Sequence, residues 1–333
     1  MYKIATLCVI LVEVNFMGVL MKKSLPIIFG LLILLCLTSC TTYVNMQVNR
    51  PAEIDLSYAE TISILPFAED PTMWDYVFVG TDTYELGKYF SNNLQSQLIS
   101  SDYFSIINSD QVLAALQNGK VPNCDVYIKG KIYDLYTSIE EEEIKAPSTE
   151  KDSENLVKYK RILKYSLNYM IIDSATGKIL KDYDKTFSKE SSFELEIEKV
   201  PSALELAQST LKTEITNLIK LIIPYTTTKS IALEKDTTKN PQMEYAKKLV
   251  KQSNYLLAYN EYLDVYEKTS MFAAGYNAGC MLFVLERYEE AEAMFEDVYN
   301  KTGNPKAQDA LREVQTEIRF QEKLDQQANN RDL

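Results

Sequence analysis

The spacing of apolar residues predicts a layered domain of strands and helices over residues 61–223. Short apolar runs at 62–67 (ISILPF) and 103–107 (YFSII) have the length of buried strands. Between them an apolar residue recurs every fourth position, as on one face of a helix, at Leu86, Phe90, Leu94 and Leu98. A short helix is expected from Ser109 to Leu116. This order of elements indicates a mixed-sheet α/β or α+β layer with packed helices.

Two further segments alternate between apolar and polar positions, as half-buried strands do. In the first, the predicted core face is Val126, Ile128, Gly130 and Ile132, and the predicted solvated face is Tyr127, Lys129, Lys131 and Tyr133. The second runs from Arg161 to Ile172, and the turn at 173–178 (DSATGK) makes a hairpin with a strand at 179–187. The polar stretch from Glu140 to Asn155 is predicted to be a solvated loop. A long helix between Pro201 and Pro224 should pack on this sheet.

The C-terminal third contains an internal repeat. Residues 254–269 (NYLLAYNEYLDVYEKT) align with 287–302 (RYEEAEAMFEDVYNKT) at an offset of 33 residues. Small and aromatic residues recur at matching positions: Ala246 with Gly279, Ala258 with Ala291, and Tyr262 with Phe295. With this period the segment resembles tetratricopeptide repeats. We therefore expect a small all-α domain over 242–333, with two repeats and a capping helix that buries Ala307, Leu311, Val314 and Ile318. Residues 224–241 are poor in apolar side chains and are predicted to be a linker.

The N-terminal segment resembles a lipoprotein signal peptide. Lys22 and Lys23 precede an apolar run of 13 residues at 25–37, shorter than the roughly 20 residues that a spanning helix needs. The run ends in a sequence that resembles the lipobox of lipoprotein signal peptidase: Leu37, Thr38 and Ser39 as recognition residues, then Cys40 as the lipidated residue. We therefore predict a signal peptide at 21–39 and a lipidated tether at 40–60.

Two details refine this prediction. Glu13 and Asn15 interrupt the apolar character of residues 1–20, so translation is expected to start at Met21. Thr41 and Thr42 follow the lipidated cysteine, in place of the aspartate that retains lipoproteins in the inner membrane. The expected location is the outer membrane, with the protein anchored by its lipid and facing the periplasm.

Composition removes several classes of function. The formal net charge of −12 disfavours nucleic acid as a partner. The chain has no histidine, which excludes Ser-His-Asp and Cys-His catalysis and histidine metal sites. The string SATGK lacks the first glycine of a phosphate-binding loop. We expect no catalytic residues, no metal, no cofactor and no enzymatic activity. Cys124 and Cys280 are expected to be buried thiols, with a disulfide between them as the alternative.

The segments at 62–67, 87–112, 124–130 and 165–180 together resemble a known envelope module. It is the nucleotide-binding-like α/β domain of curli-secretion lipoproteins, of the amino-terminal domain of the Tol system's periplasmic protein and of outer-membrane activators of peptidoglycan synthases. Taken whole, the chain resembles a Gram-negative lipoprotein family that carries a domain of unknown function. The resemblance implies architecture rather than activity. The insertion at 137–160 is too polar for the membrane strands of a secretion pore.

These features favour a non-enzymatic lipoprotein that acts as an adaptor or scaffold in cell-envelope assembly or maintenance. Envelope proteins are the expected partners, and the candidate contact residues are Tyr255, Tyr259, Tyr288 and Trp74. The 23 tyrosines leave glycan binding or uptake as one alternative, and a subunit of an oligomeric secretion or assembly complex, including a homo-oligomer, is another. Whether the repeats bind a partner or pack within the chain stays open at this point.

Overall fold

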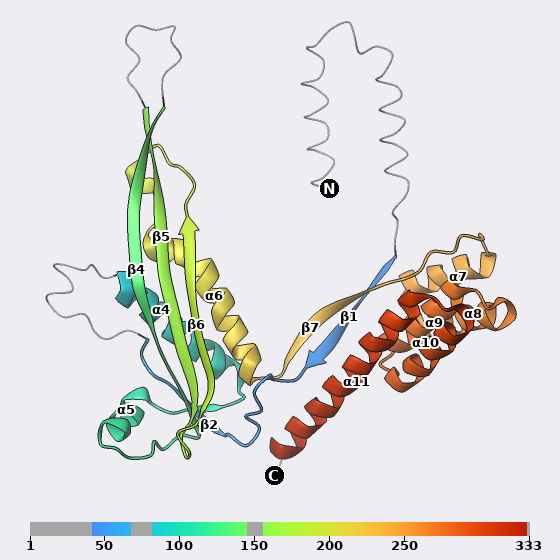
Figure 1. The fold of residues 1–333 in the computed structure, drawn as a ribbon, viewed down its shortest axis with the longest axis horizontal. Helices are drawn as coiled ribbons and strands as arrows, with labels where there is room; N and C mark the ends of the chain where they lie inside the picture. Colours follow the sequence, from blue (N-terminus) through green and yellow to red (C-terminus); the bar gives the residue numbers. More distant parts are fainter. Residues whose placement is uncertain (1–41, 68–81, 145–155, 332–333) are drawn as a thin grey trace, which may run out of the picture. The chain divides into compact units, whose positions relative to one another are not determined.

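The computed structural model describes residues 42–67, 82–144 and 156–331 (Figure 1). The chain divides into two compact units: a helical unit with residues 42–46 and 228–316, and an α/β unit with residues 47–227 and 317–331. The boundaries fall inside β1 (Tyr43–Arg50), β7 (Tyr225–Ala232) and α11 (Pro305–Arg331), so each of these elements contributes to both units. Within the described ranges, no helix combines the length and the apolar character needed to cross a bilayer.

A five-stranded mixed sheet forms the α/β unit, in the order β3-β2-β4-β5-β6. Its strands are β2 (Thr61–Ile64), β3 (Ser105–Ile106), β4 (Val126–Ile144), β5 (Leu156–Asp173) and β6 (Ile179–Glu190). The short strand β2 is parallel to both β3 and β4, whereas β4, β5 and β6 are antiparallel to one another. The predicted mixed α+β architecture is therefore confirmed, including the hairpin from β5 to β6.

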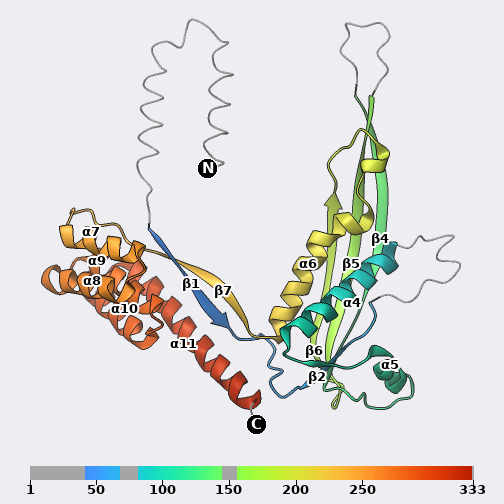
Figure 2. The ribbon, with the colours of Figure 1, turned by 180° about the vertical axis from the view of Figure 1, so that it is seen from behind.

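Helices cover the two faces of this sheet unequally. The helices α4 (Asp82–Ser101) and α6 (Ala203–Ile222) lie on one face, as Figure 2 shows. Their apolar stripes form the main core with the strand residues of that face, and the predicted stripe of α4 is fully buried at Leu86, Phe90, Leu94 and Leu98. The short helix α5 (Ser109–Gln117) belongs to a smaller core, which also buries Tyr127. Tyr127 was predicted to be solvated, and α5 is the reason that it is not.

The segment Glu140–Ile144 is strand, so the predicted loop is wrong over these residues. β4 continues to Ile144, and β5 begins at Leu156 and pairs with it residue for residue. Glu140 lies opposite Lys160, and Glu142 lies opposite Lys158. Opposite charges on directly paired residues stabilise a ladder. The glutamate run therefore supports a strand because the partner strand carries lysines in register.

The helical unit packs four helices in chain order: α7 (Pro241–Lys251), α8 (Tyr255–Thr269), α9 (Phe272–Val284) and α10 (Tyr288–Thr302). The first part of α11 follows, and Gln315 on α11 donates to Glu292 on α10 at 2.9 Å. The central helix, α9, is buried along nearly its whole length. Two of its glycines permit this packing. A Cβ on Gly275 would lie 2.6 Å from the Tyr266 ring, and one on Gly279 would lie 2.6 Å from the Phe295 ring. Both aromatic residues come from the helices on either side.

Three predicted boundaries differ from the structure. Part of the predicted tether is β1, part of the predicted linker is β7, and these strands pair in a two-stranded sheet. The predicted capping helix does bury Ala307 and Val314 in the helical unit. Its second half, residues 317–331, belongs to the α/β unit, where Glu317 and Gln327 are buried.

Candidate functional site

The outer face of the sheet is the face that α4 and α6 do not cover. It carries a group of exposed apolar residues near the end of β4 and the start of β5. Ile144 and Leu156 form the last pair of the β4–β5 ladder. The bridge between Tyr159 and Glu194 places the next stretch of chain alongside β5. Because side chains alternate along paired segments, Phe193 lies beside Lys160 and Leu195 beside Lys158, on the same face. We call Ile144, Leu156, Phe193 and Leu195 the distal face.

The charges of this region are paired with one another. Lys160 lies 2.8 Å from Glu190 and 3.2 Å from Glu140, and Lys158 lies 3.1 Å from Glu142. The hydrogen bonds that the Lys160 ammonium donates to Glu190 and Glu140 raise the pKa of Lys160. Both ammonium groups also stand over the Phe193 ring, at 4.2 Å for Lys158 and 5.3 Å for Lys160. These cation–π contacts fix the two lysines against the Phe193 ring.

The four side chains of the distal face are exposed to solvent. Leu156 and Leu195 are 59% and 60% exposed, and Ile144 and Phe193 are 39% and 37% exposed. Nearer to α5, the same outer face presents polar side chains, including a Tyr133 hydroxyl that donates to Asp184 and a Ser166–Thr186 hydroxyl pair. Grouped apolar side chains on a solvent-facing sheet are typical of a protein-interaction site.

The inner side of the helical unit is occupied by the protein's own chain. The side-chain amide of Asn277 on α9 donates to the carbonyl of Glu234 at 2.9 Å, and its oxygen accepts from the Glu234 amide at 2.7 Å. Leu233 is buried beside these bonds, and the Lys229 ammonium stands 4.9 Å above the Phe283 ring. Residues 229–234 therefore cover the surface of α9 at Asn277 and Phe283. This arrangement favours packing within the chain over the binding of a partner there.

Three of the predicted contact residues lie in the helical unit, on α8 and α10, and all three are half-buried. The Tyr259 ring holds the Arg287 guanidinium at 5.8 Å, and Tyr288 packs edge-on against Phe283 at 5.3 Å. The Tyr255 hydroxyl lies 3.5 Å from Ser253. These contacts are internal to the unit. Trp74, Cys40 and the recognition residues Leu37, Thr38 and Ser39 lie outside the described residues.

The two cysteines and the SATGK string have structural roles. Cys124 and Cys280 are both free and buried, so the alternative of a disulfide between them is not realised, and burial raises the pKa of both thiols. The SATGK string forms the predicted hairpin turn, in which Asp173 accepts from the amide and hydroxyl of Thr176 and Gly177 has a φ of +69°. Among the described residues, no group of three or more Cys, Asp and Glu side chains is arranged to hold a metal ion.

Comparisons with known proteins give remote structural likenesses alone. No protein-family model matches the sequence, and no curated protein matches it. The PelC dodecamer from Paraburkholderia phytofirmans is 12% identical, covers 54% of this chain and 96% of its own, and has a TM-score of 0.25. The hypothetical protein CT253 from Chlamydia trachomatis is 13% identical, covers 49% of this chain and 96% of its own, and has a TM-score of 0.26. Lipoprotein GNA1162 from Neisseria meningitidis is 14% identical, covers 47% of this chain and 98% of its own, and has a TM-score of 0.23. TM-scores this low establish no shared fold.

Proposed function

We propose that this protein is a non-enzymatic lipoprotein, anchored through Cys40 in the outer membrane and facing the periplasm, that acts as an adaptor or scaffold by binding another envelope protein. The lysine pair, the apolar run and the lipobox pattern of the sequence support the anchor. The lack of histidine supports a role other than catalysis. The observation that carries the binding role is the distal face.

The distal face suits a protein surface better than a lipid surface. A membrane-binding patch combines apolar side chains with lysines that attract anionic headgroups. Here Lys158 and Lys160 are neutralised by Glu140, Glu142 and Glu190. The whole chain carries a formal net charge of −12, which opposes approach to an anionic bilayer. A partner with an apolar patch is therefore the occupant that we propose.

In this proposal the helical unit does not bind the partner. Its internal repeat and its small residues at Ala246, Ala258, Gly279 and Ala291 support a tetratricopeptide-like arrangement. Because residues 229–234 already engage Asn277 and Phe283, we assign partner binding to the distal face and not to Tyr255, Tyr259 and Tyr288.

The double substitution L156E/L195E is expected to abolish partner binding without unfolding the protein. Both side chains are well exposed, so the change costs the free protein little. In a complex the two leucines would be buried, and their loss together with two added charges should weaken binding by about 100-fold or more. The measurement is quantitative recovery of crosslinked envelope partners after detergent extraction of the full lipoprotein.

The matched control is Ile99→Glu, because Ile99 is 57% exposed and lies on α4, away from the distal face. This variant should recover the partner at the level of the unchanged protein. Equal recovery with L156E/L195E, at equal expression and an equal urea midpoint, would exclude the distal face as the binding surface.

A further inference from the structure

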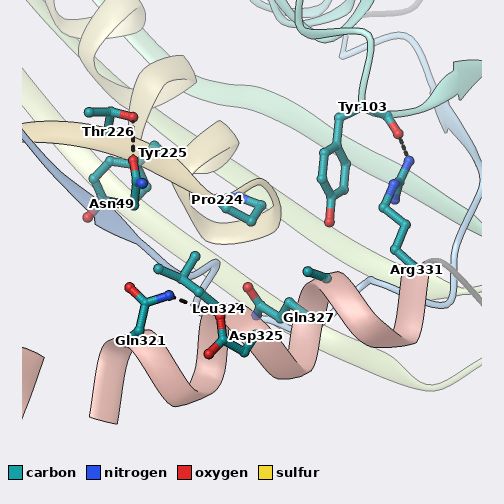
Figure 3. Close-up of a pocket in the computed structure, with 11 residues that line it drawn as sticks. Asn49, Tyr103, Pro224, Tyr225, Thr226, Gln321, Leu324, Asp325, Gln327 and Arg331 are labelled. Carbon is teal, nitrogen blue, oxygen red and sulfur yellow. Dashed lines mark hydrogen bonds between the residues drawn. The ribbon is translucent and has the colours of Figure 1, made fainter. Parts of the chain in front are cut away.

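A pocket of about 460 Å³ lies inside the α/β unit, beside the second half of α11. Figure 3 shows its lining: Asn49 from β1, Tyr225 and Thr226 from β7 and its preceding Pro224, Tyr103 from the turn before β3, and one side of α11. The α11 side is formed by Gln321, Leu324, Asp325, Gln327, Ala328 and Arg331. This volume is at the small end of the roughly 300–1,000 Å³ range of ligand pockets.

The walls of the pocket are fixed by buried polar contacts. Gln327 is 3% exposed, and its side-chain amide exchanges two hydrogen bonds of 3.1 Å with the backbone of Ala52. Arg331 donates to the carbonyls of Tyr103 and Ala59. These bonds tie the end of α11 to the segments that precede β2 and β3, so both sides of the pocket are held in place without a ligand.

The lining of the pocket contains both aromatic rings and hydrogen-bonding groups. The Arg331 guanidinium stacks on one face of the Tyr103 ring at 3.7 Å, and in Figure 3 the ring stands between Arg331 and Pro224. The Tyr225 ring also makes a cation–π contact, in which the Lys220 ammonium lies 4.9 Å from the ring centroid. At the rim, the Thr226 hydroxyl donates to Oδ1 of Asn49 at 2.8 Å, which leaves the Asn49 amide group as a donor.

Charge narrows the class of ligand. Gln321 donates to Oδ1 of Asp325 at 2.9 Å, and the second carboxylate oxygen remains an acceptor for a hydroxyl or amine. That carboxylate repels acidic ligands. Arg331, the cation in the lining, is already engaged by two carbonyls and the Tyr103 ring. Asn49 and Asp325 offer hydrogen-bonding groups that a purely apolar ligand would not use.

We propose that this pocket binds a saccharide that carries no acidic group, one or two sugar rings in size. The apolar face of a pyranose ring would pack on Tyr103 and Tyr225, and its hydroxyls would bond to Asn49 and Asp325. The inference is independent of partner binding at the distal face, because the two sites share no residue.

The test uses the full-length protein in detergent with glucose, galactose, mannose and N-acetylglucosamine as probes, and N-acetylneuraminic acid as the acidic counterpart. Saturation-transfer NMR should detect at least one of the four non-acidic sugars at millimolar concentration and not the acidic one. Asp325→Ala should weaken that binding by about 10-fold or more, because a charge-assisted hydrogen bond is lost. Asp309→Ala, on the same helix but outside the pocket lining, should leave it unchanged.

Both aspartates are exposed, so neither substitution should unfold the protein. The proposal is overturned if none of the four sugars binds, if the acidic sugar alone binds, or if Asp325→Ala and Asp309→Ala bind equally. Uncharged tripeptides are tested in parallel. Binding of these at Asp325, with no sugar bound, would assign the pocket to peptides and likewise overturn the proposal.

Discussion

Replacing Gly130 with alanine is expected to lower the free energy of unfolding of the α/β unit by about 3 kcal/mol or more. A Cβ at this position would lie 2.3 Å from the backbone carbonyl oxygen of Asn168 on β5 and 2.4 Å from the Phe67 ring. The carbonyl is held by the β4–β5 ladder and Phe67 is 1% exposed, so neither neighbour can move away without breaking the core. Urea unfolding of the alanine variant measures the loss.

Gly119→Ala provides the control for this prediction. Gly119 has a φ of +64°, but nothing lies within 4 Å of a Cβ placed there. The substitution should therefore cost only the backbone strain of a left-handed residue, about 1 kcal/mol. If the two alanine variants unfold at the same urea concentration, the close approach of β4, β5 and Phe67 is not as described.

Glu317→Ala should destabilise the α/β unit by about 3–5 kcal/mol, because it leaves a partly buried guanidinium without its partner. Arg50 makes two hydrogen bonds to Glu317, at 2.7 and 2.9 Å, and the two side chains are 14% and 4% exposed. Arg50 also stands 4.9 Å above the Phe320 ring. The expected result is a large decrease in the urea midpoint.

Two comparisons make this prediction specific. Glu313→Ala, four residues earlier, removes an ion pair with Lys229 whose glutamate is 65% exposed, and it should cost less than about 1 kcal/mol. The double variant Arg50→Met/Glu317→Leu replaces both charges with apolar groups and should recover much of the stability. A loss with Glu317→Ala no larger than that with Glu313→Ala would mean that α11 does not anchor the α/β unit.

The α/β unit could be predicted from the sequence because its elements have strong local patterns. The stripe of α4, the alternation at Val126–Tyr133 and the DSATGK turn each specify one structure without reference to distant residues. The end of the β4–β5 hairpin could not be predicted in this way. Four successive glutamates show no alternation, and it is their register with Lys158 and Lys160 that makes a strand of them.

The strands β1 and β7 were not predicted, although their sequences have features typical of strands. Val44, Met46 and Val48 alternate with polar residues, and all three are buried. β7 begins with Tyr225 followed by three threonines, and both residue types favour strands. The attachment of α11 to the α/β unit is different in kind. It depends on Glu317 and Gln327, which meet residues more than 260 positions earlier in the chain, and nothing in the local pattern indicates those contacts.

The candidate site, the distal face, could not be predicted from local sequence patterns either. Leu156, Phe193 and Leu195 are ordinary apolar residues in the sequence, and only the pairing of three segments brings them to one face. The predicted contact tyrosines of the helical unit are engaged within it, by Arg287, Phe283 and Ser253. A repeat pattern predicts a binding groove, but it does not show that the chain's own residues 229–234 pack on α9 at Asn277 and Phe283.

Binding of another envelope protein at the distal face can be detected in cells by site-specific photocrosslinking. A photoreactive phenylalanine analogue is placed at position 195, or at position 99 as the control, in the full-length lipoprotein in intact cells. We expect a discrete adduct with a different envelope protein from position 195 and none from position 99. The same adducts from both positions, or adducts at 195 only with lipid or with a second copy of the chain, would contradict this expectation.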